Sequence, residues 1–214
     1  GSLFSKWNLT RLYDLVFFMS DGSFPFLFGK RNLVHFQVPF TKVGGDPSVN
    51  LIKGFLIHKL VFNSEFTANV IKRQLHFCPS VMLYPPIDTE SFRPGKKENL
   101  ILSVARFDSP SHAKRQDILI EAFKKLREEN KNFKLVLTGG LKGGEEYLVS
   151  LKAMAGTLPI EFIPNPGFPE LKKLYAKAKI FWHAAGYGID ESVEPEKVEH
   201  FGITTVEAMS AGAV

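Results

Sequence analysis

The feature that most limits the fold of this chain is the regular alternation of strand-like and helix-like segments after residue 98. Apolar runs with the length of buried strands occur at 99–105, 133–138, 160–163 and 179–183. Between them, apolar residues recur at helical spacing at 118–126, 147–154 and 171–178. Repeated strand–helix–strand units build parallel sheets that are covered by helices on both faces. The pattern therefore predicts an α/β fold with a Rossmann-like, doubly wound parallel sheet.

The first third of the chain has the same character and leads into a proline-rich linker. Strands are expected at 13–19, 32–38 and 60–63, and Ser64 is expected to cap a helix that runs on to Ile71. The doublet Pro85-Pro86 and the later Pro94 interrupt regular structure and stiffen the chain. We therefore predict two domains, residues 1–84 and residues 99–214, which are joined by a linker at residues 85–98.

Composition narrows the class of protein further. Cys78 is the only cysteine, so no intramolecular disulfide framework and no zinc cluster are expected. A single thiol suits a reducing compartment, and we predict a cytoplasmic protein. The longest apolar runs, at 15–19 and 101–105, have the length of strands and fall far short of the ~20 residues of a membrane helix.

The charge of the chain indicates an anionic partner. The formal net charge is +5 and the sequence pI is near 9.2. Nucleic acid is disfavoured, because the charge is scattered along amphipathic helices and no RNA-recognition, zinc-finger or basic-tail signature is present. A phosphate-bearing small molecule and an anionic membrane surface remain as alternatives. Peripheral contact with the inner face of a membrane is motivated by the basic helix residues Lys72, Arg73, Lys124 and Lys125.

Arg106 and Lys114 are the first candidate site residues. They flank the loop between the strand at 99–105 and the next helix. In parallel sheets, ligands bind beyond the carboxyl ends of the strands. Two cations at that edge suit a diphosphate, which Arg grips with two hydrogen bonds and Lys holds as a point charge. The alternative interpretation is a pair of ordinary surface cations.

Residues 199–212 contain two glutamates, Glu199 and Glu207, around a Gly-Ile-Thr-Thr turn. Thr204 and Glu207 have the spacing of a capping box, in which each side chain satisfies a backbone N–H of the other residue, with Gly212 as the C-terminal stop of the helix. That interpretation leaves Glu199 unexplained. A helix N-terminus after Gly202 would also bind phosphate, and carboxylates accept hydrogen bonds from sugar hydroxyls.

Other signatures of catalysis are absent from the sequence. There is no Walker A phosphate loop, no dinucleotide-binding glycine fingerprint, no nucleophile elbow and no zinc-protease motif. The glycines at 139–144 follow a strand and are interpreted as a turn. No Asp-x-Asp pair is present to hold a metal–diphosphate unit, so no metal and no cofactor are expected. A departing diphosphate would then be stabilised by protein cations and by the helix dipole.

Together these segments resemble the retaining GT-B glycosyltransferases of family 4, also called group 1 glycosyltransferases. The most specific match is the stretch with seven residues between Glu199 and Glu207. Further matching segments lie at 103–106, 114–116, 118–123 and 171–178. The segment 84–94 resembles the family's interdomain linker, and the segment 62–64 resembles a part of its N-domain. The resemblance covers roughly residues 55 to 214. It implies two Rossmann-like domains, here both incomplete, so that the chain is a fragment.

The resemblance also implies roles for single residues. Arg106 and Lys114 would hold the donor diphosphate, Glu207 the ribose, and Glu199 a hydroxyl of the donor sugar. His35 would face that sugar from the N-domain, although the family places a proline closer to this histidine. The backbone would contact sugar and phosphate at Phe201, Gly202, Ile203, Thr204 and Thr205. The loop from Arg106 to Lys114 is also one or two residues longer than the family pattern.

The implied function is transfer of a hexose from a nucleoside-diphosphate sugar to a hydroxyl of a saccharide or lipid-linked acceptor. The resemblance implies retention of anomeric configuration and no metal. Residues 1–84 would lie on the acceptor side, and residues 99–214 would bind the nucleotide sugar. A nucleotide-sugar epimerase of the same fold is the alternative enzyme, and a basic nucleic-acid-binding protein is the alternative outside enzymes.

Overall fold

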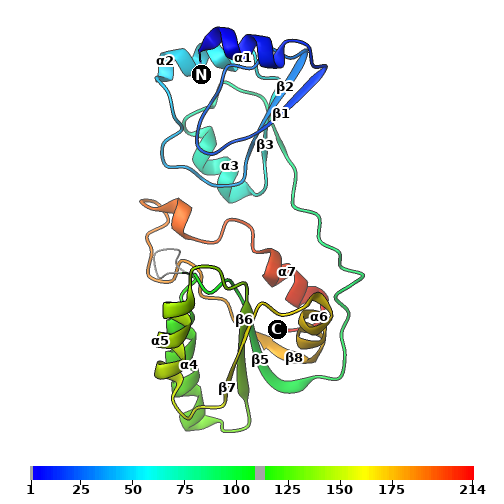
Figure 1. Cartoon of the computed structure of the whole chain (residues 1–214), viewed down its shortest axis with the longest axis vertical. Helices are drawn as coiled ribbons and strands as arrows, with labels where there is room; N and C mark the ends of the chain where they lie inside the picture. The colour runs from blue at the N-terminus through cyan, green and yellow to red at the C-terminus, as the bar shows by residue number, and fades with distance from the viewer. Residues whose placement is uncertain (1, 109–113) are drawn as a thin grey trace. The chain divides into compact units, whose positions relative to one another are not determined.

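The computed structural model describes residues 2–108 and 114–214, and the chain forms two compact units. Unit 1 comprises Gly1–Pro85 with Asp190–Phe201, and unit 2 comprises Pro86–Ile189 with Gly202–Val214. Each unit contains one sheet of four parallel strands with helices packed against it (Figure 1). The predicted α/β class with two Rossmann-like parallel sheets is confirmed.

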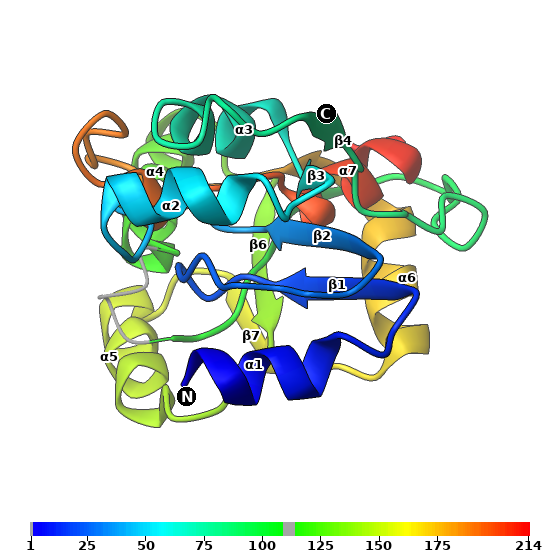
Figure 2. The same cartoon turned by 90° about the horizontal axis from the view of Figure 1, so that it is seen from above.

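Unit 1 is built around a sheet with the strand order β1-β2-β3-β4. Helix α1 lies alongside the edge strand β1 (Figure 2). The core contains Phe36 and Phe62 from neighbouring strands, with Ile71 of α3 and the buried Cys78. The elements of the unit are α1 (Leu3–Thr10), β1 (Leu15–Met19), β2 (Arg31–Phe36), α2 (Pro47–Gly54), β3 (Lys59–Phe62), α3 (Glu65–Lys72), β4 (Ser80–Met82) and the 3-10 turn η2 (Pro195–Lys197).

Several elements of unit 1 differ from the prediction. Ser64 caps α3 as expected, because its hydroxyl accepts a hydrogen bond from the Thr67 N–H. Helices α1 and α2 and the short strand β4 were missed. The start of α2 does carry a recognisable signal, since the Asp46 carboxylate accepts from the N–H groups of Ser48 and Val49, and Pro47 occupies the first turn.

Unit 2 contains every strand and helix that the alternating pattern predicted after residue 98. Its sheet has the order β7-β6-β5-β8, so that β5 and β6 are the central strands. Predicted and observed ends agree within a few residues. The elements are β5 (Glu98–Val104), α4 (Gln116–Glu129), β6 (Lys134–Gly139), α5 (Glu145–Ala155), β7 (Ile160–Pro164), α6 (Phe168–Lys177), β8 (Ala178–Phe181) and α7 (Ile203–Ser210).

Strand β5 is buried on both faces of its sheet. Ile101 packs with residues of α4 and α5, whereas its neighbours Leu100 and Leu102 pack with residues of α6 and α7. Successive side chains of a strand point to opposite faces, so one apolar run supplies two cores. Figure 1 shows the two helix pairs on opposite sides of the sheet. This is the doubly wound arrangement that the sequence predicted.

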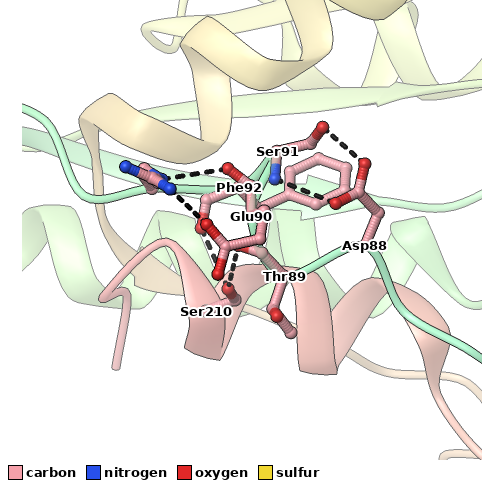
Figure 3. Close-up of polar contacts among 7 residues, drawn as sticks. Asp88, Thr89, Glu90, Ser91, Phe92 and Ser210 are labelled. Atoms are coloured by element: carbon pink, nitrogen blue, oxygen red, sulfur yellow. Dashed lines mark hydrogen bonds and ion pairs between the residues drawn. The ribbon is translucent and has the colours of Figure 1, made fainter.

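The chain that enters unit 2 is fastened to the C-terminal end of α7. Residues 83–97 form neither helix nor strand. The Ser210 hydroxyl lies 3.0 Å from the Thr89 carbonyl and 2.9 Å from the Phe92 carbonyl (Figure 3). Nearby, the Lys97 ammonium donates to the carbonyls of Ala178 and Ala211 at 2.9 and 2.6 Å. The Lys97 bonds satisfy carbonyls at the C-caps of α6 and α7, where the last carbonyls lack partners within the helix. The Ser210 contacts instead join the end of α7 to carbonyls of the segment 83–97.

Helix α7 ends where the sequence predicted. Gly212 has φ 72°, and its N–H donates to the Met209 carbonyl. The N–H of Ala213 donates to the Ala208 carbonyl. These two bonds form a Schellman motif, which requires the left-handed conformation that glycine adopts without a steric penalty.

Substituting Ser210→Ala should lower the free energy of unfolding of unit 2. The change removes the side-chain donor between α7 and residues 89–92, and a hydrogen bond of this kind contributes about 0.5–1.5 kcal/mol. Ser150→Ala is the matched control, because within the part of the chain that the structure describes the Ser150 hydroxyl donates only to the Tyr147 carbonyl of its own helix. Urea denaturation of both variants measures the difference. Equal effects of the two substitutions would show that the contact between α7 and residues 89–92 contributes nothing.

Candidate functional site

A pocket of about 400 Å³ lies in unit 2 at the carboxyl ends of β5, β6 and β7. In parallel α/β sheets this edge is where ligands bind. The first turn of α7 closes one side of the pocket through Thr204. The residues that line it are Val104, Ala105, Arg106, Gly139, Gly140, Asn165, Pro166, Leu171 and Thr204. Two of the site residues predicted from the sequence, Arg106 and Thr204, therefore contribute to one pocket.

Arg106 lies two residues beyond the end of β5, and both its backbone and its side chain are held by neighbouring residues. Its carbonyl accepts a hydrogen bond from the Gln116 side chain at 2.9 Å, which fixes the backbone. Its guanidinium lies 3.2 Å from Asp108 Oδ2, and the Arg106 side chain is 67% exposed. Asp108 Oδ2 is buried and makes no hydrogen bond within the described residues, so the contact is an ion pair without hydrogen-bond geometry. The arginine head is thus oriented but accessible.

Lys114, the second predicted cation, lies just before α4 and is partly buried. The middle of the loop that joins it to Arg106, residues 109–113, lies outside the described residues. Arg115 follows with φ 50°, a left-handed conformation that is uncommon for a residue with a side chain. Its guanidinium binds both carboxylate oxygens of Asp117 and donates to the Tyr187 carbonyl. These contacts hold the start of α4, and sequence reasoning did not identify them.

The glycines after β6 allow two backbone segments of the pocket wall to touch. Gly139 has φ 148°, and a Cβ at this position would lie 2.1 Å from the Ala105 carbonyl oxygen. A Cβ on Gly144 would lie 1.6 Å from the Phe107 carbonyl oxygen. Both contacts are far below van der Waals distance, so only glycine fits. The segment interpreted as a simple turn therefore packs the wall of the pocket against the loop that carries Arg106.

The predicted capping box at the start of α7 is wrong. The helix begins at Ile203, two residues earlier than the capping box requires, and its N-cap is Gly202, with φ 84° and no side-chain capping bond. The Glu207 carboxylate binds elsewhere: the Tyr175 hydroxyl donates to its Oε2 at 2.7 Å. The N-cap Gly202 has no side chain to cap the first turn of α7, which includes Thr205, and this turn reaches the pocket through Thr204.

Glu207 is a half-buried carboxylate whose main polar neighbour is the hydroxyl of Tyr175. Burial raises the pKa of Glu207, and the hydrogen bond from Tyr175 acts in the opposite direction. Burial also raises the pKa of Tyr175, with further contributions from its hydrogen bond and from the charge of Glu207. The tyrosine is therefore a neutral hydroxyl donor at all ordinary pH values. Sequence reasoning gave it no role, although it lies in the segment 171–178 that matches the family.

The remaining predicted residues belong to unit 1. His35 lies near the carboxyl end of β2, is 8% exposed, and contacts the Phe17 ring at 5.6 Å between centroids. Burial lowers its pKa, so the imidazole is neutral near pH 7. Its Nε2 is buried and makes no hydrogen bond within the described residues. Glu199 and Phe201 lie in the segment Asp190–Phe201 of the same unit, where the Phe201 ring contacts Tyr84 at 5.9 Å.

The described residues contain neither a metal-binding cluster nor a helix suited to cross a membrane. Among residues 2–108 and 114–214, no group of three or more His, Cys, Asp or Glu side chains is arranged to hold a metal ion. None of the helices that the structure describes combines the length and the apolar character needed to cross a membrane.

Comparison with known proteins identifies the family. The family model described as "Glycosyl transferases group 1" matches residues 86–214. The matched region includes β5, the pocket and the whole of α7. The chain therefore belongs to the group 1 glycosyl transferases, as the motif around Glu199 and Glu207 predicted.

Several curated relatives share one description, "GDP-Man:Man(3)GlcNAc(2)-PP-Dol alpha-1,2-mannosyltransferase". The protein of Xenopus laevis is 32% identical over an alignment of 148 positions, and the match covers 62% of this chain and 28% of that protein. For Mus musculus the identity is 31% over 179 aligned positions, and the match covers 72% of this chain and 32% of the relative. For Dictyostelium discoideum the identity is 28% over 184 aligned positions, and the match covers 76% of this chain and 34% of the relative. The chain thus spans about a third of the length of these relatives.

Solved structures share the fold at low sequence identity. TarM has a TM-score of 0.66 at 13% identity, over 98% of this chain and 42% of its own. The apo structure of OtsA has a TM-score of 0.64 at 12% identity, over 95% of this chain and 57% of its own. The pneumococcal O-GlcNAc transferase GtfA, in complex with UDP and GlcNAc, has a TM-score of 0.60 at 15% identity, over 86% and 36%. These likenesses show a common fold.

The burial of Glu207 predicts a specific dependence of stability on pH. Because its pKa is raised above 4.5 in the folded chain, the folded state binds more protons than the unfolded state in the window just above that pH. The contribution of Glu207 to the free energy of unfolding therefore falls as pH rises through this window. Glu207→Gln should remove that contribution while an amide oxygen still accepts from Tyr175.

The measurement is urea denaturation of the wild type and of Glu207→Gln at a series of pH values from acid to neutral. The variant should gain stability relative to the wild type as pH rises. A stability difference that stays constant across the series would contradict the assignment of a raised pKa to this carboxyl.

Proposed function

We propose that the protein is a glycosyltransferase that transfers a hexose from a nucleoside-diphosphate sugar to an acceptor hydroxyl. One observation carries this proposal: a single pocket at the carboxyl ends of β5, β6 and β7 is lined by Arg106 and by the first turn of α7, the helix that also bears Glu207. A cation and a helix N-terminus suit phosphate, and a carboxylate suits vicinal hydroxyls. Membership of the group 1 family supports the same reaction class.

In this proposal the nucleotide is bound by residues of unit 2. Arg106 and Lys114 hold the diphosphate, and the backbone at Ile203, Thr204 and Thr205 adds the positive end of the α7 dipole. Glu207 accepts hydrogen bonds from the ribose hydroxyls. The exposed guanidinium of Arg106 can leave Asp108 for a phosphate, because a bidentate pair with a phosphate is the stronger interaction.

The sugar is assigned to a second set of residues, with Glu199 and His35 as the proposed catalytic residues. Glu199 binds a hydroxyl of the donor sugar, and the backbone of Phe201 and Gly202 lines the same subsite. The neutral imidazole of His35 offers a donor or an acceptor to the sugar without adding charge. Its buried Nε2, which lacks a hydrogen bond within the described residues, is an observation that favours a ligand-facing role.

We propose that the anomeric configuration is retained and that no metal is required. The bond between the anomeric carbon and the phosphate oxygen breaks, and the acceptor oxygen bonds to the same face of that carbon. The acceptor proton passes to an oxygen of the departing diphosphate, so no separate base is needed. The charge that develops on the leaving group is stabilised by Arg106, Lys114 and the N-terminus of α7.

The relatives suggest which donor and acceptor to test first. Their shared description contains a GDP-mannose donor and a dolichol-pyrophosphate-linked acceptor. We propose GDP-mannose as donor and a lipid-linked saccharide as acceptor for this protein as well. Such an acceptor would bring a cytoplasmic protein to the surface of a membrane, where basic residues favour anionic lipid.

Transfer from GDP-mannose to a lipid-linked oligosaccharide tests the proposal, with the configuration of the product read by NMR. We expect an α-linked product, whose formation continues in the presence of EDTA. An inverted product would overturn retention, and loss of activity that Mg²⁺ restores would overturn metal independence. Conversion of the donor to an epimer in the absence of acceptor would favour the epimerase alternative.

Arg106→Ala should weaken binding of GDP about 10- to 100-fold, because a hydrogen bond between charged groups contributes roughly 1.5–3 kcal/mol. Arg127→Ala is the matched control. Arg127 lies in the last turn of α4 and lines a separate pocket with Asn99 and Lys134, away from the carboxyl ends of the strands. Isothermal titration calorimetry of both variants makes the comparison. An equal loss of affinity in the two variants would show that general charge, and not this position, binds the diphosphate.

A further inference from the structure

Tyr175 occupies an aromatic cluster in which only its hydroxyl is polar. It lies in α6 and is fully buried. Its ring centroid lies 5.1 Å from that of Phe92 and 6.1 Å from that of Phe181. A phenylalanine would fill this space equally well, and burying a hydroxyl is unfavourable unless it forms a hydrogen bond. Packing alone therefore does not explain why this position carries a tyrosine and not a phenylalanine.

The hydroxyl reaches across to α7 and contacts two acceptors. It lies 2.7 Å from Glu207 Oε2 and 3.3 Å from the carbonyl oxygen of Thr204. A hydroxyl has one hydrogen, and the shorter contact to the carboxylate takes most of it. Thr204 is itself part of the pocket wall. One buried oxygen thus contacts both the first turn of the helix and its glutamate.

Because of this contact, the two carboxylate oxygens of Glu207 have different hydrogen-bonding environments. Oε2 is engaged by Tyr175, whereas Oε1 has no hydrogen-bond partner within the described residues. With one oxygen held, the side chain of Glu207 is restricted in rotation, and the other oxygen keeps a fixed direction. A fixed acceptor recognises a pair of vicinal hydroxyls better than a freely rotating one, because less side-chain freedom is lost on binding.

We propose that Tyr175 is a positioning residue that orients Glu207 for recognition of the ribose hydroxyls of the nucleotide. It touches no ligand itself and acts through the carboxylate. This inference rests on the proposed function, in which Glu207 binds ribose. It adds a residue that controls how strongly the site distinguishes ribose from a sugar without those hydroxyls.

The test compares Tyr175→Phe with the wild type against two probes, GDP and its 2′,3′-dideoxy analogue. We expect the wild type to bind GDP more tightly than the analogue. Tyr175→Phe should reduce that preference about three- to tenfold, as loss of one hydrogen bond implies, while affinity for the dideoxy analogue stays nearly constant. A purely structural role would weaken both probes equally and leave the preference unchanged.

Tyr147→Phe is the matched control for loss of a tyrosine hydroxyl. The Tyr147 hydroxyl lies 3.4 Å from Gln116 and 3.5 Å from a carboxylate oxygen of Asp117, on the face of the sheet covered by α4 and α5. This variant should keep the full preference for GDP. The double variant Tyr175→Phe/Glu207→Gln should show no more loss of preference than Glu207→Gln alone, because the tyrosine acts only through the carboxylate.

The possible outcomes separate the two proposals. If the wild type binds neither probe, or binds both equally, the proposed nucleotide site fails. If the wild type prefers GDP and Tyr175→Phe retains the same preference, the positioning role fails while the site stands. A further loss of preference in the double variant would also overturn the positioning role. Thermal melting of each variant with and without GDP confirms that the compared proteins are folded.

Discussion

The pocket of unit 2 depends on one constraint, the burial of strand β5 on both faces. A strand in this position must be apolar on both sides, and its polar backbone groups must all be used in the sheet. Ile101 faces the helices α4 and α5, and Leu102 faces α6 and α7. The buried stretch of this strand, residues 100–104, carries no charge and has Ser103 as its one polar side chain, and Arg106 is the first charged residue beyond its end.

The wall of the pocket is made by backbone contact, and its chemistry is supplied by side chains from separate elements. Gly139 brings the end of β6 against Ala105, and the pocket then opens between these strand ends and α7. Arg106 carries a positive charge at the pocket, and Glu207, on the same helix as the pocket residue Thr204, carries a half-buried carboxylate. In the proposed function these two groups bind the phosphate and the hydroxyls of one ligand.

The sequence predicted unit 2 better than unit 1, for a physical reason. Apolar strands such as 99–105 and amphipathic helices such as 118–126 carry periodicity that survives without tertiary information. By contrast, β4 has only three residues, and the main sequence signal for α2 is its N-cap residue Asp46. The partner of Glu207 could not be predicted, because Tyr175 reaches it across 32 residues of sequence, whereas a capping box is visible within four.

Helix α7 is held at both ends within its unit. Its eight residues span about 12 Å, with Tyr175 near the pocket and the contacts of Ser210 and Lys97 at the far end. A short helix of this kind would fray in isolation, since a few turns cannot offset the cost of nucleation. Here the loss of conformational entropy is incurred when the chain folds. A ligand that meets the first turn of α7 therefore finds its N–H groups already aligned, and its affinity is reduced by little further ordering of the protein.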